Sequence, residues 1–224
     1  MRNVKKRFEE VADEYDEEFV KLIPHYQASI EALINTIPFD ENKEIKILDL
    51  GCGTGVVTKN LKELFPNSTV TCLDLSPKMI EIAKEKLKNY KGIEFFVGDF
   101  LNFEFEEGYD AVLSSLAIHH INDNDKKTLY KRIYNILNKG GIFYNNDRVE
   151  APTNHLQKVY HDAFVNNLRK NYGNEKIEEI DKIADDNDIP SKLYEQLQWL
   201  EEVGFKSIDV VWKYYAQGVF GGEK

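Results

Sequence analysis

Three glycines stand close together after an apolar run that ends at Leu50. They are Gly51, Gly53 and Gly55, and glycine lets the backbone adopt angles that a Cβ forbids and lets a ligand approach the main chain. The dinucleotide-binding pattern would need a glycine in place of Val56, so NAD and FAD are disfavoured. The phosphate-binding Gly-Lys-Ser/Thr pattern is also missing. The stretch therefore predicts a loop that binds a different nucleoside ligand.

An acidic residue supports this prediction. Asp74 ends the next apolar run, about 20 residues beyond the loop, where a carboxylate can accept hydrogen bonds from both hydroxyls of a ribose. The alternative is that Asp74 only caps a helix or lies in a solvated loop. We expect ribose binding, because the glycine loop and the acid occur together.

Two adjacent histidines, His119 and His120, follow a later apolar run. A histidine at that place could act as a general base at neutral pH, and we expect a catalytic or substrate-contacting role for His119. The alternative is a histidine that caps the following helix or bonds the backbone. No metal site is expected, because the five histidines have no ligand spacing with the two cysteines. Four tyrosines could line an aromatic acceptor pocket or belong to the core: Tyr15, Tyr160, Tyr214 and Tyr215.

Alternating strands and helices must position these residues. The glycine loop follows the first strand and leads into a helix that stops before Pro66, and Ser76 caps another helix that begins at Pro77. Asp123 is expected to cap a third. Such a rhythm predicts a parallel sheet with ligands at the carboxyl ends of its strands. The apolar runs place strands at 45–50, 69–73, 93–97, 110–114 and 142–146.

The two ends of the chain follow other patterns. Apolar spacing predicts a helix over 4–20 and a second after Pro24. The span 147–192 is too long for a plain connection and is expected to be an inserted helical cap. Its helical patterns cover 154–170 and 175–187, a further helix covers 191–203, and two strands at 206–213 and 214–220 form an antiparallel hairpin.

Five motifs follow one another along the chain: LDLGCGTG (48–55), CLDLSPKMIEIAK (72–84), VGDF (97–100), YDAVLSS (109–115) and LNKGGIF (137–143). In this order and spacing they resemble the class I S-adenosylmethionine (SAM) methyltransferases. The resemblance implies an α/β, Rossmann-like fold with a seven-stranded, mostly parallel sheet, an antiparallel last strand and a helical cap. It also implies one domain over 1–224, with the helices of 1–40 as a lid over the cofactor.

The resemblance also implies a role for each matching residue. Asp49 lies where the methionyl amino group of SAM is approached, and Asp74 binds its ribose. The backbone of the loop faces the cofactor, and Ser114 lies beside the methionine part. The remaining positions contribute loop backbone at Gly51, Cys52 and Gly53, packing near the adenine at Leu75 and Met79, and adenine contacts at Asp99 and Phe100.

A closer resemblance is to the carboxy-SAM synthases. Segments 23–26, 120–137 and 199–215 are similar, and the matching tyrosine of those enzymes implies that Tyr26 contacts the cofactor. Two positions differ: Gly53 replaces a serine, and Trp199 replaces the arginine that holds the extra carboxylate. We therefore expect methyl transfer from ordinary SAM. A carboxy-SAM synthase-like enzyme and a SAM-binding module without turnover remain as alternatives.

The charge and composition of the chain limit the kinds of molecule that it is expected to bind. The 224 residues carry a net charge of −10, which disfavours a nucleic-acid surface. The segment Ser114–Ala117 replaces the Asn-Pro-Pro-Tyr type signature of nucleic-acid amino methyltransferases, so a small-molecule acceptor is expected. The two cysteines and the lack of a long apolar run indicate a cytoplasmic protein that does not span a membrane. A homodimer is compatible with the sequence, which does not determine the oligomeric state.

Overall fold

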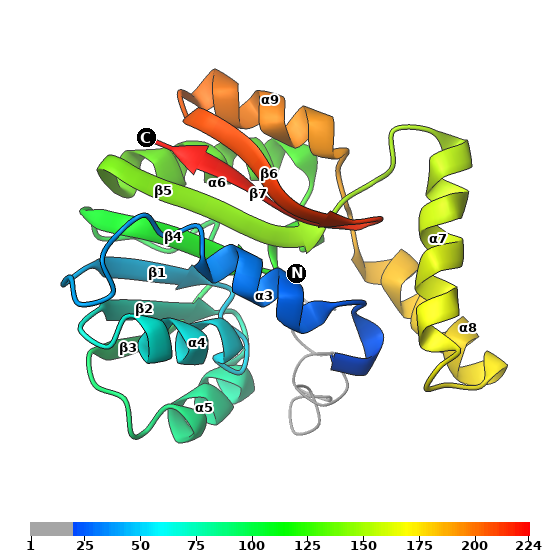
Figure 1. Cartoon of the computed structure of the whole chain (residues 1–224), viewed down its shortest axis with the longest axis horizontal. Helices are drawn as coiled ribbons and strands as arrows, with labels where there is room; N and C mark the ends of the chain where they lie inside the picture. The colour runs from blue at the N-terminus through cyan, green and yellow to red at the C-terminus, as the bar shows by residue number, and fades with distance from the viewer. Residues whose placement is uncertain (1–19) are drawn as a thin grey trace.

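The computed structural model describes residues 20–224, without the side chains of residues 185 and 186. Seven strands form one sheet in the order β3-β2-β1-β4-β5-β7-β6 (Figure 1). Only β7 runs antiparallel to its neighbours, which confirms the predicted sheet. The strands are β1 (Lys46–Leu50), β2 (Thr69–Asp74), β3 (Ile93–Val97), β4 (Tyr109–Ser115), β5 (Leu137–Arg148), β6 (Lys206–Tyr214) and β7 (Gln217–Glu223).

A helix precedes β1, and helices lie in the connections between the strands except those from β3 to β4 and from β6 to β7. A short 3₁₀ turn, Ile118–His120, also precedes the helix between β4 and β5. The helix predicted over 4–20, with Tyr15 in it, lies outside the described residues except for Val20. The helices are α3 (Tyr26–Ile34), α4 (Val56–Leu64), α5 (Pro77–Lys86), α6 (Asp123–Ile136), α7 (Asn154–Leu168), α8 (Asn174–Asn187) and α9 (Leu193–Val203).

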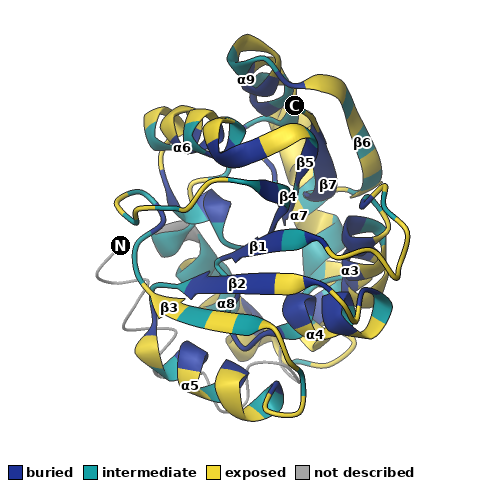
Figure 2. Ribbon diagram, turned by 90° about the vertical axis from the view of Figure 1, so that its left-hand side faces the viewer, coloured by how far each residue is buried: buried dark blue, intermediate teal, exposed yellow. Residues whose placement is uncertain are grey.

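The sheet has a hydrophobic core on each face, because neighbouring strand residues point to opposite sides. On β1, Ile47 packs with α3 and α4, whereas Leu48 packs with α6 and α9. Burial is concentrated on the central strands and on the inward sides of these helices (Figure 2). Helices α7 and α8 belong to neither layer. They lie beyond the carboxyl ends of the strands, where the ligand is expected (Figure 1).

Helix α3 is part of this layered core. Ile30, Leu33 and Ile34 are buried, and the helix contacts β5, β6, β7 and α4. Only its first turn, with Tyr26, reaches the carboxyl edge of the sheet. The lid predicted from residues 1–40 is therefore, in its described part, a covering helix with one end at the site.

One predicted cap is confirmed and one is wrong. Ser76 accepts a hydrogen bond from the backbone N–H of Met79 at 3.3 Å, and Pro77 opens α5. The next helix is capped by Asn122, whose side chain accepts the N–H of Asp125 at 3.0 Å, and not by Asp123. A cap residue needs an extended backbone, and Asn122 has it, whereas Asp123 is already helical.

The strands after α6 differ from the prediction in their bounds. β5 begins at Leu137, which pairs with Tyr109, and extends to Arg148, which pairs with Gln217. The hairpin turn lies at Tyr215, whose φ is 47°, so β7 begins later than predicted. These ends depend on pairing with distant strands, which local sequence patterns do not reveal. In the described part of the chain, no helix is both long and apolar enough to cross a membrane.

Candidate functional site

Hydrogen bonds hold the glycine loop, which follows β1, against the end of β2. The N–H groups of Gly51 and Cys52 both donate to the carbonyl of Leu73, at 2.8 and 3.0 Å. Gly51 has a φ of 73°, and a Cβ there would lie 2.3 Å from the Cβ of Ala117. Glycine is therefore required at this position by both backbone conformation and space.

Asp74 and the loop form one hydrogen-bonded unit. One carboxylate oxygen accepts the N–H of Gly53 at 2.8 Å, and the other accepts the N–H of Ser76 at 2.8 Å. Burial raises the pKa of Asp74, and these backbone donors oppose that rise. Each oxygen has further acceptor capacity, so a ribose diol can be added without displacing the backbone bonds.

Asp49 is a fully buried acid with one unsatisfied oxygen. Thr58 on α4 donates to Oδ2 at 2.6 Å, whereas Oδ1 has no hydrogen-bond partner among the described residues. Burial raises its pKa to about 7, although the bond from Thr58 opposes this rise. A cation bound above the loop would favour the ionised form, which suits a ligand with an ammonium group.

A cavity, here called the loop cavity, opens above these residues and encloses about 330 Å³, including space open to solvent. Helix α4 begins at this cavity, with Gly55 before it and no side-chain cap, and its first N–H groups favour an anionic group. The structure thus brings Tyr26 to the predicted loop. The walls are Tyr26, Gly51, Cys52, Gly53, Thr54, Val56, Val57, Ser115 and Leu116.

Other predicted residues are engaged in internal contacts. Ser114 is fully buried and donates to the carbonyl of Leu50 at 2.8 Å, so the neighbouring Ser115 lines the cavity in its place. Asp99 accepts the N–H of Leu101 at 2.9 Å within a turn. Leu75 is partly exposed, whereas Met79 and Phe100 are buried. All three lie beyond β2 and β3 and do not line the loop cavity.

Two more cavities lie between the sheet edge and the helices α7 and α8. The one here called the cap cavity encloses about 540 Å³, including open space, and shares Leu116 with the loop cavity. Leu116 adopts a left-handed backbone with a φ of 55°. The other, here called the tyrosine cavity, is lined by Tyr160, Tyr214 and Tyr215 among others, so three of the four predicted tyrosines share one cavity.

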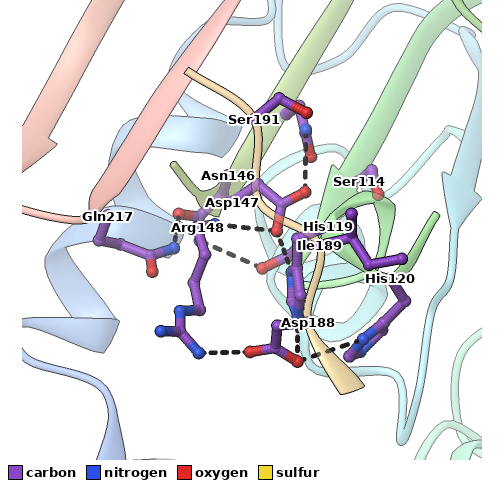
Figure 3. Close-up of polar contacts among 12 residues, drawn as sticks. Ser114, His119, His120, Asn146, Asp147, Arg148, Asp188, Ile189, Ser191 and Gln217 are labelled. Carbon is purple, nitrogen blue, oxygen red and sulfur yellow. Dashed lines mark hydrogen bonds and ion pairs between the residues drawn. The ribbon is translucent and has the colours of Figure 1, made fainter. Parts of the chain in front are cut away.

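A charged network forms one wall of the cap cavity (Figure 3). The Nδ1 atom of His119 bonds a carboxylate oxygen of Asp147 at the end of β5. Its Nε2 atom lies 3.5 Å from Oδ1 of Asp188, and Nδ1 of His120 lies 3.4 Å from the same oxygen. The other oxygen of Asp188 is paired with Arg148. Residues from three distant segments therefore meet at one carboxylate.

The two carboxylates control the charge of His119. Burial lowers its pKa, but Asp147 and Asp188 outweigh burial and raise the pKa to about 9. In Asp147, burial raises the pKa and His119 outweighs it, so the pKa is lowered overall. His119 is thus protonated at neutral pH, with both ring nitrogens facing carboxylates. That state is the opposite of what a general base needs, and it does not support the expected base role.

A neighbouring network fixes the end of β5 to α3. The side-chain amide of Asn146 donates to Ser29 and to Ser115, at 3.1 Å each. Its carbonyl oxygen accepts from Gln217 at 2.8 Å. Since Ser29 also donates to the carbonyl of Tyr26 at 2.8 Å, the network holds the helix turn that carries Tyr26.

Sequence reasoning missed the polar end of β5 and Asp188. Residues 145–148 read Asn-Asn-Asp-Arg, and the first three are almost fully buried. Consecutive polar residues at the carboxyl end of a central parallel strand were the available signal. Asp188 gave no local signal, because the residues before it, 185–187, are also polar or acidic.

Comparisons with known proteins agree with this geometry. A family model described as a methyltransferase domain matches residues 47–141. The chain is 31% identical to an uncharacterised methyltransferase of Oceanobacillus iheyensis, over 70% of this chain and 72% of that protein. It is 26% identical to carboxy-S-adenosyl-L-methionine synthase of Nautilia profundicola, over 94% of this chain and 92% of that protein.

Another relative is matched over a shorter range. The chain is 32% identical to malonyl-[acyl-carrier protein] O-methyltransferase 1 of Ilyobacter polytropus, over 62% of this chain. The match spans 50% of that protein, so this chain covers about half of its length. Among solved structures, the DhpI-SAM-HEP complex superposes with a TM-score of 0.66 over 98% of this chain and 95% of that chain. At 18% identity, this likeness shows a shared fold.

Proposed function

The chain belongs to the class I SAM-dependent methyltransferase family, and we propose that it transfers a methyl group from SAM to a small-molecule acceptor. One observation carries the proposal: the loop cavity, which the glycine loop lines, meets the cap cavity at Leu116. A cofactor in the first cavity and an acceptor in the second would meet at that residue.

The cofactor roles follow the chemistry of SAM. Asp74 would accept hydrogen bonds from the ribose hydroxyls, and Asp49 would provide negative charge for the methionyl ammonium group. The uncapped start of α4 suits the methionyl carboxylate. The loop backbone and the first turn of α3 would enclose the sulfonium. The proposed contacts are Tyr26, Asp49, Gly51, Cys52, Gly53, Asp74, Leu75, Met79, Asp99, Phe100 and Ser114, with Ser115 added from the structure.

Methyl transfer is an in-line displacement. A lone pair of the acceptor forms a bond to the methyl carbon while the bond from that carbon to sulfur breaks, and S-adenosylhomocysteine leaves without the sulfonium charge. The protein must align the two molecules and exclude water. Helices α7 and α8 fit the role of a cap that does this, because residues of both line the cap cavity with Leu116 and His119. His119 would then contact the acceptor as a positively charged group.

The likeness to a carboxy-SAM synthase keeps one alternative reaction in view. A carboxylated cofactor needs a positive partner, and the residue that matches the family's arginine is Trp199. This side chain is buried in the core formed with α6, where Lys127 lies 4.9 Å from its ring centre. It therefore supplies no charge near the loop, and ordinary SAM is favoured. Product formation from SAM and prephenate would support the alternative.

Calorimetric titration of SAM and S-adenosylhomocysteine into the ligand-free protein tests the proposal. Removing the charged hydrogen-bonding partner in Asp74→Ala should weaken binding about tenfold to a hundredfold. The same titration of Asp99→Ala measures the contribution of the acid that is proposed to contact the adenine. A folded wild type that binds neither ligand would refute the proposal. Binding without methyl loss against a broad acceptor panel would indicate a SAM-binding module without turnover.

A further inference from the structure

His119, His120 and Asp188 bring three potential metal-binding atoms together on the wall of the cap cavity. One ring nitrogen of each histidine and one carboxylate oxygen of Asp188 lie within 4.8 Å of one another. Nε2 of His119 and Nδ1 of His120 face Oδ1 of Asp188, and Nδ1 of His120 also lies 3.3 Å from the carbonyl oxygen of Asn187. Two histidines and one carboxylate are a donor set suited to zinc and similar transition metals. We propose that this cluster is a divalent transition-metal site that leaves one coordination position open to the cap cavity.

The distances fit a four-coordinate ion. In a tetrahedral zinc site with bonds of about 2.0–2.2 Å, neighbouring ligand atoms lie about 3.3–3.6 Å apart. Asp188 lies 3.5 Å from His119 and 3.4 Å from His120, which matches this spacing. The ligand atoms of the two histidines lie within 4.8 Å of one another, so an ion would be completed by an adjustment of the histidine rings. The side chains of the three residues converge in Figure 3, and all three residues line the cap cavity.

A second carboxylate holds one of the ligands in the orientation that metal sites use. Ligating histidines almost always bond a carboxylate or a carbonyl through their other ring nitrogen. Asp147 makes this contact with Nδ1 of His119, and it is itself fixed by the N–H of Arg148 at 2.9 Å and by Asn145 at 3.2 Å. His119 thus presents Nε2 toward the cluster. In the free protein this nitrogen carries a proton, which a bound ion would displace, so that the charge of the ion replaces the charge of the imidazolium beside Asp188.

The backbone brings the third ligand to the other two. The N–H of Ile189 donates to the carbonyl of His119 at 2.7 Å, so Asp188 is held beside the histidines by main-chain geometry. Lys126 also bonds Ser191 at 2.6 Å, which fixes the chain just beyond. Arg148 pairs with Oδ2 of Asp188 and leaves Oδ1 toward the histidines. The three proposed ligands also line the cap cavity, which a cluster with only a structural role would not require.

The site suggests the kind of acceptor, and this step rests on the proposed function. A bound ion would complete its coordination with an oxygen or sulfur atom from the cap cavity, where Leu116 and Phe164 provide apolar walls. Metal coordination lowers the pKa of a bound hydroxyl or thiol and leaves it a better nucleophile, with its proton released to solvent. The acceptor class would then be a small molecule with an ionisable hydroxyl or thiol group.

Titration of Co²⁺ and Zn²⁺ into chelator-treated full-length protein, without SAM, tests the site. We expect one Co²⁺ per chain with the strong visible absorption of four-coordinate cobalt. His120→Ala and Asp188→Ala should each weaken binding at least about a hundredfold. Asp147→Asn should weaken it about tenfold to a hundredfold through its effect on His119. Circular dichroism checks the fold of each variant.

The chain offers a matched control. His161 also lies 2.7 Å from a carboxylate, that of Asp181, but as a simple exposed pair. His161→Ala should leave Co²⁺ binding unchanged. Equal binding by the wild type and a folded His120→Ala variant would overturn the proposal. Since the titration contains no SAM, failure of the metal site leaves SAM binding to be judged separately by its own titration.

Discussion

The two sides of the proposed reaction centre are built in different ways. The cofactor side is centred on one continuous stretch, residues 49–76, whose loop is held by hydrogen bonds from backbone N–H groups to Leu73 and Asp74. The cap side takes His119, Asp147 and Asp188 from three distant parts of the chain and joins them through side-chain charges. Each side should therefore fail for a different reason when it is changed.

The cofactor side is stabilised by local backbone conformation, whereas the cap side depends on contacts between distant elements. On the cofactor side, glycine conformations and a helix start are fixed locally, so many sequences with the same pattern can form the same loop. On the cap side, buried charges need partners that only the fold provides. A ligand common to a family suits the first construction, and a ligand specific to one protein suits the second.

The largest effect is expected when a buried charge loses its partner. Asp147→Ala leaves the His119 imidazolium without its closest carboxylate in a buried place, and should lower the free energy of unfolding by about 3–5 kcal/mol. Urea denaturation at pH 7 measures the loss. Asp181→Ala removes the partner of the half-exposed His161 and should cost no more than about 1 kcal/mol. Similar losses in both variants would remove the contrast between buried and exposed pairs.

A somewhat smaller effect is expected at the tight point of the glycine loop. In Gly51→Ala the new methyl group meets Ala117 and the backbone keeps a positive φ, so unfolding should become easier by about 2–4 kcal/mol. Gly53→Ala also has a positive φ, but apart from its chain neighbours none of residues 20–224 lies within 4 Å of the added Cβ, and a loss of about 1 kcal/mol is expected. Thermal denaturation compares the two.

A compensating change sharpens this prediction. Ala117→Gly in the Gly51→Ala background removes the contact between the two methyl groups but keeps the strained backbone. Part of the lost stability should return. A double variant as unstable as Gly51→Ala would show that the contact with Ala117 does not matter.

The pH dependence of SAM binding tests Asp49. The pKa of Asp49 is about 7 in the free protein and 3.8 in the unfolded chain. The contribution of Asp49 to the stability of the free protein is therefore lost as the pH rises from about 4 to about 7. A bound ammonium group favours the ionised form, so SAM should bind about tenfold more weakly at pH 6 than at pH 7.5. Calorimetry at both values measures this. Asp49→Asn should remove most of the difference, and an unchanged difference in that variant would exclude Asp49 as its source.

The smallest expected effect concerns the helix start beside Asp74. Ser76→Ala removes the side-chain acceptor for the N–H of Met79 and should cost about 1 kcal/mol of stability. Ser76→Asp keeps a capping oxygen and should remain close to the wild type. Chemical denaturation distinguishes the two, and an equal loss in both variants would show that capping is not what Ser76 contributes.

Local patterns predicted most of the fold. The alternation of apolar runs gave the central strands within a few residues, and Ser76 with Pro77 gave the start of α5. The prediction failed in two places: β5 extends to Arg148 because it pairs with β7, and Asn122 caps α6 because its backbone is extended whereas Asp123 is helical. Pairing partners and cap conformations are decided by the assembled backbone.

The sequence by itself determined the cofactor side, because Gly51 and Asp74 lie at fixed steps along a strand, a turn and a helix. Only the tertiary structure decided the cap side. His119, Asp147 and Asp188 carry no common spacing, and their meeting depends on β5 ending beside the turn after β4 and on the return of the chain after α8. Periodicity reports contacts within an element. Charges that meet across elements follow from the packing of the whole chain, and the charge of His119 follows in turn from those neighbours.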